Sequence, residues 1–429
     1  MGIRLVNKTS STGHNLDMLR SLVLAFTCTL LAQEPLRLPR EHRDYGLPNA
    51  NATWLPYSED AEHPCNEIWR AMYLTRCTPR HVAGALPREH RDPQKFFVPG
   101  WYFAKRTGTE SDQRLFGGDG RQLPVEGFSA TASQELGRLL RQVEGDVLRE
   151  LKSRPRAAVW FQHDLLRLAR RLIDTKQNPS LLKPLLRCAQ RVALPRATLQ
   201  SDALQTASPT QIATELAGFD LTDSVEIQRR SSRLFDAEYV QLWSSVYLTT
   251  PGKSPQATVA WLTGSEARPP LPLHSTALLV QGVVAVDDAG APCATQLILE
   301  ARTQRLVNTK PLAFDNRTTT RDGVDFAIWS LPRAAVRDYD GGTTAVACTD
   351  FRSIDMESQD LFRDYGTRKH TTYAAQCTLC HRRSETPDEA IAGFSALRRS
   401  SEPRPAEPGE RKAQAEREML RFLDKLASK

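Results

Sequence analysis

Two cysteines and a histidine in the last part of the sequence have the spacing of a reactive site. The stretch C-T-L-C-H runs from Cys377 to His381. The thiols of Cys377 and Cys380 can each add to one vinyl group of a haem, while the imidazole of His381 turns to the iron. Chance explains this arrangement poorly, because the 429 residues include only eight cysteines and nine histidines.

Other chemistry also uses two cysteines at this spacing. A redox-active dithiol normally opens a helix in a βαβ fold, and no such pattern surrounds Cys377. A structural zinc site needs a second ligand pair, and none is evident near the motif. A plain disulfide between Cys377 and Cys380 is the third alternative. We favour one covalently attached haem c, and the three alternatives stay open.

The motif resembles the haem-attachment site of c-type cytochromes, a resemblance limited to these five residues, an export signal and a helix at the end of the chain. It implies that Cys377 and Cys380 form the thioether bonds and that His381 is the proximal iron ligand. The distal ligand is expected from Met419, the only methionine after the motif, or from His370, seven residues before it. No serine-nucleophile, phosphate-loop or zinc-protease motif occurs, so no catalytic residue is assigned.

An apolar run near the start predicts export. Met18, Leu19 and Arg20 precede the run from Ser21 to Ala32, which has the length of a signal-peptide core. We expect a signal peptide over residues 1–32, with Met18 as a candidate start, and a periplasmic or secreted protein with no integral membrane span once the signal is removed. Cys28 follows Phe26 and Thr27, where a lipoprotein signal has small residues, so no lipid anchor is expected.

Export also bears on the remaining cysteines, because disulfides persist in oxidising compartments. We expect pairs within single segments, Cys65 with Cys77 and Cys293 with Cys348, although the connectivity cannot be read from the sequence. Cys188 lies in an apolar helical pattern and is expected to be a buried thiol.

The composition fits a folded soluble protein, with 40% hydrophobic and 25% charged residues. The net charge of +7 comes from scattered arginines without an aromatic-interleaved basic stripe, so we expect no nucleic-acid binding. The expected partner is a periplasmic redox protein of unknown identity. The alternative function is a non-enzymatic secreted binding or scaffold protein in which Cys377 and Cys380 form a disulfide.

The pattern of apolar residues predicts an α+β fold in three parts after the signal. A loop-rich and then helical part covers 33–250, a β-rich, sandwich-like part covers 251–355, and the haem-attachment segment with a C-terminal helix covers 356–429. Three helices are expected at 136–151, 161–172 and 182–192, and a fourth at 410–426 whose apolar face docks on the haem-bearing segment. Strands are expected at 277–286, 296–301, 324–329 and 343–348.

Overall fold

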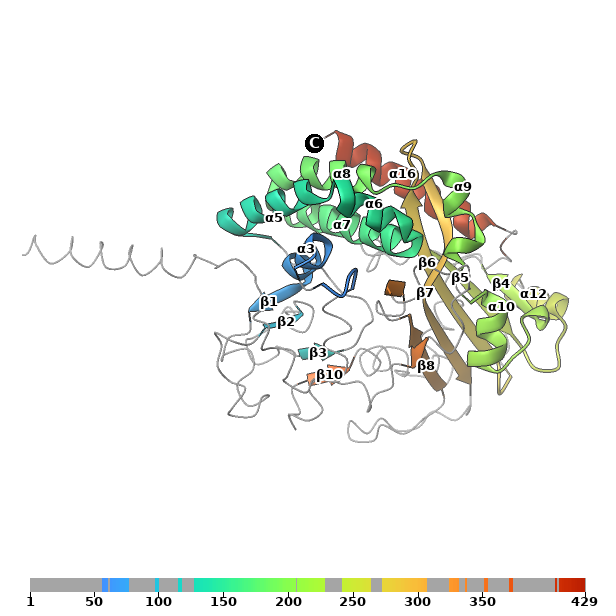
Figure 1. Ribbon diagram of the computed structural model, residues 1–429. Coiled ribbons are helices and arrows are strands. Elements are labelled where there is room, and N and C mark those ends of the chain that lie inside the picture. Colours follow the sequence, from blue (N-terminus) through green and yellow to red (C-terminus); the bar gives the residue numbers. More distant parts are fainter. Residues whose placement is uncertain are drawn as a thin grey trace, which may run out of the picture.

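Helices of the middle of the chain pack on one large antiparallel sheet, which makes the fold mixed α+β (Figure 1). The structure is a computed structural model, and it describes residues 56–60, 62–76, 97–99, 115–117, 127–205, 207–227, 241–263, 272–306, 324–331, 336–337, 351–353, 370–372, 406 and 409–428.

The helical layer begins with α3 and is built mainly by α5 to α8, at one end of the sheet (Figure 1). Its helices are α3 (Pro64–Tyr73), α5 (Ala130–Gln142), α6 (Gly145–Ser153), α7 (Pro155–Thr175) and α8 (Leu182–Arg191). The expected second and third helices are confirmed as α7 and α8. Pro155 starts α7 at a position where its missing N–H is harmless, and Lys176 ends it in the left-handed conformation.

The expected first helix is two helices. The apolar residues from Leu136 to Leu151 keep a helical spacing, but α5 ends at Gln142 and α6 begins at Gly145, whose φ is +56°. Glycine adopts this conformation without the steric cost of a side chain. The prediction of one continuous helix is therefore wrong, because the periodicity does not register the turn.

The main sheet has six strands in the order β4-β5-β6-β7-β8-β9, and every neighbouring pair is antiparallel. The strands are β4 (Ser224–Ile227), β5 (Leu242–Thr249), β6 (Thr276–Val286), β7 (Pro292–Leu306), β8 (Val324–Ser330) and β9 (Arg352–Ser353). The strands expected at 277–286, 296–301 and 324–329 are confirmed as β6, β7 and β8, while 343–348 lies outside the described residues.

Two strands of the sheet were not expected, and they precede residue 251, where we placed the start of the β-rich part. These are β4 and β5, so the sheet takes strands from both sides of that border. Two short pairs are separate from it: β1 (Leu74–Arg76) with β2 (Phe97–Pro99), and β3 (Leu115–Gly117) with β10 (His370–Thr372). A sandwich needs a second sheet packed face to face, and that part of the expectation stays a prediction.

Shorter elements complete the fold around the sheet. They are η5 (Pro179–Leu181), α9 (Arg196–Leu199), η6 (Asp202–Leu204), α10 (Pro209–Gln211), the π-helical η7 (Ile212–Ala217), η8 (Leu221–Asp223) and α12 (Pro255–Thr263). Figure 1 shows α10 and α12 beside β4, away from the helical layer.

The C-terminal helix α16 (Glu410–Ala427) confirms the fourth expected helix, but its apolar face packs elsewhere than expected. That face lies on β5 and β7, and Phe422 contacts Arg170 of α7. Two hydrogen bonds fix the helix on the sheet: the Arg411 Nε donates to the Ser244 carbonyl oxygen at 3.0 Å, and the Ala294 N–H donates to the Glu416 carboxylate at 2.7 Å. The expectation of docking on the haem-bearing segment is corrected accordingly.

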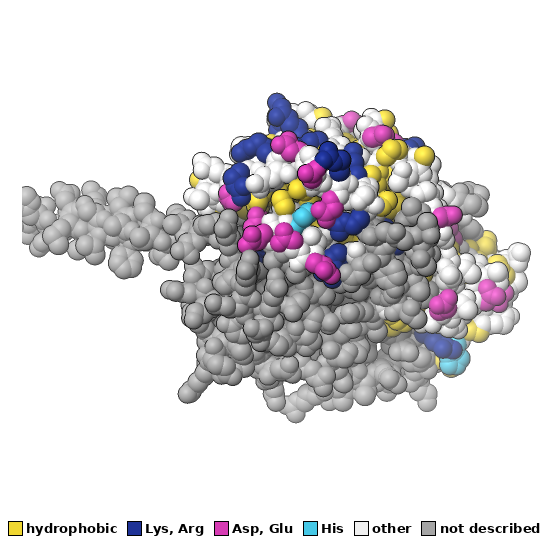
Figure 2. All heavy atoms as spheres, viewed as in Figure 1, with side chains coloured by type: hydrophobic (Ala, Val, Ile, Leu, Met, Phe, Trp, Pro, Cys, Tyr) yellow, Lys and Arg dark blue, Asp and Glu magenta, His cyan; other side chains and the backbone are white. Residues whose placement is uncertain are grey.

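One hydrophobic core joins the helical layer, the sheet and α16. A smaller cluster contains Val225, Leu248 and Leu306 and is covered in part by Val259 of α12. On the face shown in Figure 2, acidic and basic side chains are interspersed over the described surface, as the scattered arginines suggest. No helix within the described ranges is long and apolar enough to cross a membrane.

Candidate functional site

The residues predicted to hold haem fall largely outside the part of the chain that the structure describes. This applies to Cys377, Cys380 and His381. His370 opens β10, which pairs in parallel with β3 at Leu115. Met419 is 0% exposed, in the core that α16 forms with the sheet and the helical layer, a position that fits an ordinary core residue. The predicted signal peptide and Cys28 also lie outside the described residues.

His63 has a structural role at the start of α3. Its Nδ1 accepts a hydrogen bond from the Cys65 N–H at 3.3 Å, so the side chain caps the helix. Its Nε2 lies 3.6 Å from the Glu150 carboxylate of α6. Burial lowers the pKa of His63, although Glu150 acts in the opposite direction.

Cysteines form a second group of predicted site residues. Cys65, Cys188 and Cys293 are free and buried, and the partners expected for Cys65 and Cys293, which are Cys77 and Cys348, lie outside the described residues. The two pairings stay predictions. Burial raises the pKa of the Cys65 thiol, and the nearby Cys188 raises it further. Burial likewise raises the pKa of Cys188 to about 12, in agreement with the expected buried thiol.

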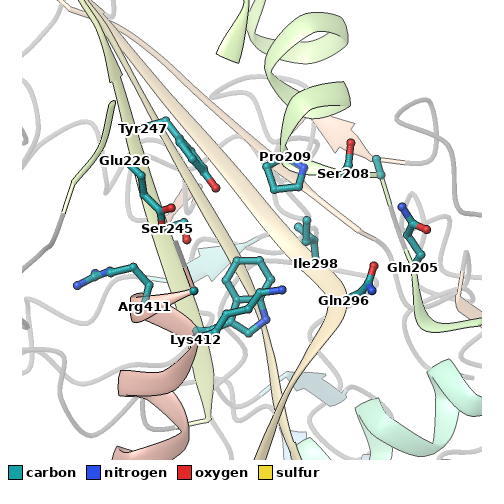
Figure 3. A pocket seen from close by; sticks show the side chains of 13 residues that line it. Gln205, Ser208, Pro209, Glu226, Ser245, Tyr247, Gln296, Ile298, Arg411 and Lys412 are labelled. Carbon is teal, nitrogen blue, oxygen red and sulfur yellow. The ribbon is translucent and has the colours of Figure 1, made fainter. Parts of the chain in front are cut away.

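A cavity of about 270 Å³ lies between the sheet, the α9–α10 connection and the start of α16 (Figure 3). Five separate parts of the chain form it. Its lining residues are Gln205, Ala207, Ser208, Pro209, Glu226, Trp243, Ser245, Tyr247, Gln296, Ile298, Gly409, Arg411 and Lys412. Polar and charged side chains share the lining with Trp243, Pro209 and Ile298, so the cavity offers a ligand both hydrogen-bonding groups and apolar surface.

Trp243 forms a rigid wall of this cavity. It is 2% exposed, and its indole Nε1 donates to the Thr295 carbonyl oxygen at 2.8 Å. Gly282 is its cross-strand neighbour on β6, at a register irregularity. A Cβ on Gly282 would lie 2.4 Å from the Trp243 ring, so this position accepts only glycine while the ring keeps its place.

Two oppositely charged side chains line the cavity from different elements. Glu226 projects from β4 and Lys412 from the first turn of α16, and the Lys412 Nζ lies 4.7 Å from the centre of the Trp243 ring. Burial lowers the pKa of Lys412, while Cys293, Glu226 and Glu416 act in the opposite direction. Burial, assisted by Glu226, raises the pKa of Tyr247 to about 12, so its phenol is a neutral hydrogen-bonding group.

Figure 3 shows how these groups are placed. Glu226, Ser245 and Tyr247 lie on one side of the cavity, and Gln205 and Gln296 lie on the other. Hydroxyl and carboxamide groups both donate and accept hydrogen bonds, so together with the two charges they can orient a small polar molecule. Among the described residues, no group of three or more His, Cys, Asp or Glu side chains could hold a metal ion.

Sequence reasoning missed this cavity entirely, since none of its lining residues was singled out. The one signal was the alternation of Trp243, Ser245 and Tyr247, which places three side chains on one face of a strand. Comparisons with protein families, curated proteins and solved structures found no match.

Proposed function

We propose that the chain is a periplasmic or secreted protein with one covalently bound c-type haem and a role in electron transfer or another haem-based redox process. One observation carries the proposal: the C-T-L-C-H stretch, with its two thiols and adjacent imidazole. In attachment, each thiol of Cys377 and Cys380 adds across a haem vinyl group, so that a thioether forms and no separate oxidant is needed. The bound haem iron would then carry one electron at a time.

The role of the protein's own residues in this proposal is to hold the iron. His381 supplies the proximal ligand, and His370 or Met419 is the candidate for the distal one. The two distal candidates differ in their surroundings, because Met419 belongs to the closed core and His370 stands on a short strand that ends five residues before Cys377. A ligand role for His370 therefore requires less rearrangement of the described core.

A haem stain combined with a pyridine haemochrome spectrum tests the proposal. The full chain, from its first residue, is co-expressed with a cytochrome c maturation system and analysed after denaturation. We expect haem to stay on the denatured chain and to be lost in the Cys377→Ala, Cys380→Ala double variant. Cys348→Ala is the matched control and should keep its haem. Absence of haem from the unmodified chain would refute the proposal.

The cavity favours a second candidate function, a non-enzymatic secreted binding protein with a Cys377–Cys380 disulfide. In that case no haem attaches, and peptide mapping without reductant finds the two cysteines joined. The haem stain and the peptide map together distinguish the two candidates.

A further inference from the structure

The cavity beside Trp243 contains two opposite charges that are not paired with each other. Glu226 and Lys412 are both half-buried and both line the cavity. Within the described part of the chain, neither side chain makes an ion pair or a side-chain hydrogen bond. The Lys412 ammonium lies over the Trp243 ring, and the charges of Glu226 and Glu416 act on it from farther away. Arg411, the third charged lining residue, is instead held by the Ser244 carbonyl oxygen.

Unpaired charges away from bulk water are costly, because the lost hydration is not replaced. The fold holds the backbones of these two residues on separate elements. Glu226 is fixed by the pairing of β4 with β5, where it lies opposite Tyr247, and Lys412 is fixed by the docking of α16 and by the Trp243 ring. A ligand that carries one positive and one negative group would pair with both.

We propose that this cavity binds a small zwitterion with the chemistry of a free α-amino acid. Its ammonium group lies against the Glu226 carboxylate and its carboxylate lies against the Lys412 ammonium. The neutral groups of Ser245, Tyr247 and Gln205 complete its hydrogen bonds. Tyr247 is suited to this role because its phenol stays protonated.

The size of the cavity agrees with this class of ligand. At roughly 30 Å³ for each water molecule, a volume of about 270 Å³ holds about nine waters. This is room for a single amino acid or a very short peptide. A free amino acid and a dipeptide share the same terminal charges, and the difference in their lengths lets the experiment tell them apart.

The test uses the full chain and measures thermal stability and calorimetric binding with a panel of the common free amino acids. The same amino acids are supplied as N-acetyl derivatives, which lack the ammonium group, and as amides, which lack the carboxylate. Dipeptides form the last arm, and neutral sugars serve as a chemically different panel. We expect at least one free amino acid or dipeptide to bind and both of its blocked forms to bind at least about tenfold more weakly.

Two variants assign the ends of the ligand. In Glu226→Gln the penalty for N-acetylation should disappear, and in Lys412→Gln the penalty for amidation should disappear, with affinity for the unblocked ligand falling at least about tenfold in each. Glu215→Gln and Lys425→Gln change exposed residues of the same types and should bind as the unmodified chain does. A general loss of fold would not produce these two separate patterns.

Failure of this proposal is distinguishable from failure of the haem proposal. Both cavity variants should still stain for haem, because neither changes the attachment motif. Binding of neutral sugars alone, no binding by any zwitterion, or unchanged penalties in both variants would each overturn the proposal.

Discussion

Replacing Gly282 with alanine tests the packing that forms the cavity wall. The new Cβ would lie 2.4 Å from the Trp243 ring, whereas carbon atoms in contact are ordinarily about 3.5–4.0 Å apart. Either the ring or strand β6 must therefore move by more than about 1 Å. The ring cannot move without weakening its hydrogen bond to the Thr295 carbonyl oxygen.

The cost follows from two contributions. Overpacking of a filled core costs about 1–3 kcal/mol, and a buried donor left without its acceptor costs about 1–3 kcal/mol more. We expect Gly282→Ala to reduce the free energy of unfolding by about 2–6 kcal/mol. Urea denaturation of the full chain, followed by tryptophan fluorescence and circular dichroism, measures this change.

A second glycine supplies the control. In Gly137→Ala the added Cβ meets its nearest atom, on Arg141, at 3.8 Å, which is ordinary contact. Because Gly137 lies within helix α5, this change should stabilise the protein by about 0.5–1 kcal/mol. In a Trp243→Leu background, Gly282→Ala should cost less than in the unmodified chain. Equal stability of Gly282→Ala and the unmodified protein would refute this account of the cavity wall.

Three further predictions concern the core and its titrating groups. Met419→Ala removes a side chain that is 0% exposed and should cost about 2–5 kcal/mol in urea denaturation, whereas Leu420→Ala, at a position that is 48% exposed, should change stability by less than about 0.5 kcal/mol. The folded-state pKa of His63 is lowered, so the contribution of His63 to the free energy of unfolding is full above the unfolded pKa of about 6.5 and decreases as the pH falls below that value. His63→Gln should therefore make the urea midpoint less dependent on pH in this range. An unchanged pH dependence in the variant would contradict this account. With a pKa of about 12 for Cys188, iodoacetamide at about pH 8 should label this thiol only after denaturation, and mass spectrometry of labelled peptides would show any reaction in the native state.

The helices could be predicted because their signal is local. Apolar residues recur every three or four positions in α7, α8 and α16, and each of these elements lies where that spacing puts it. The same reasoning did not predict the break at Gly145, because the apolar periodicity continues through a turn that only the backbone geometry reveals.

Strand β5 was not predicted, for a different reason. Two serines occupy its centre, and Ser245 is nevertheless buried, because the start of α16 and the residues around Pro209 close over that face. From the sequence alone, serines such as these indicate a loop rather than a buried strand. Only the distant segments that cover it show otherwise, and the cavity was missed together with the strand that forms its wall.

The two proposed sites depend on the fold in different ways. The attachment motif consists of five consecutive residues, so the sequence alone indicates its chemistry. A thioether bond is covalent and persists when the chain unfolds. The cavity instead brings together Glu226 of β4 and Lys412 of α16, which meet only when the sheet is formed and the C-terminal helix is docked on it. Ligand binding in the cavity should therefore vanish at the same urea concentration as the native tryptophan fluorescence, whereas the proposed covalent haem should stay on the unfolded chain. Binding that persists in the unfolded protein would mean that the two charges are not what recognises the ligand.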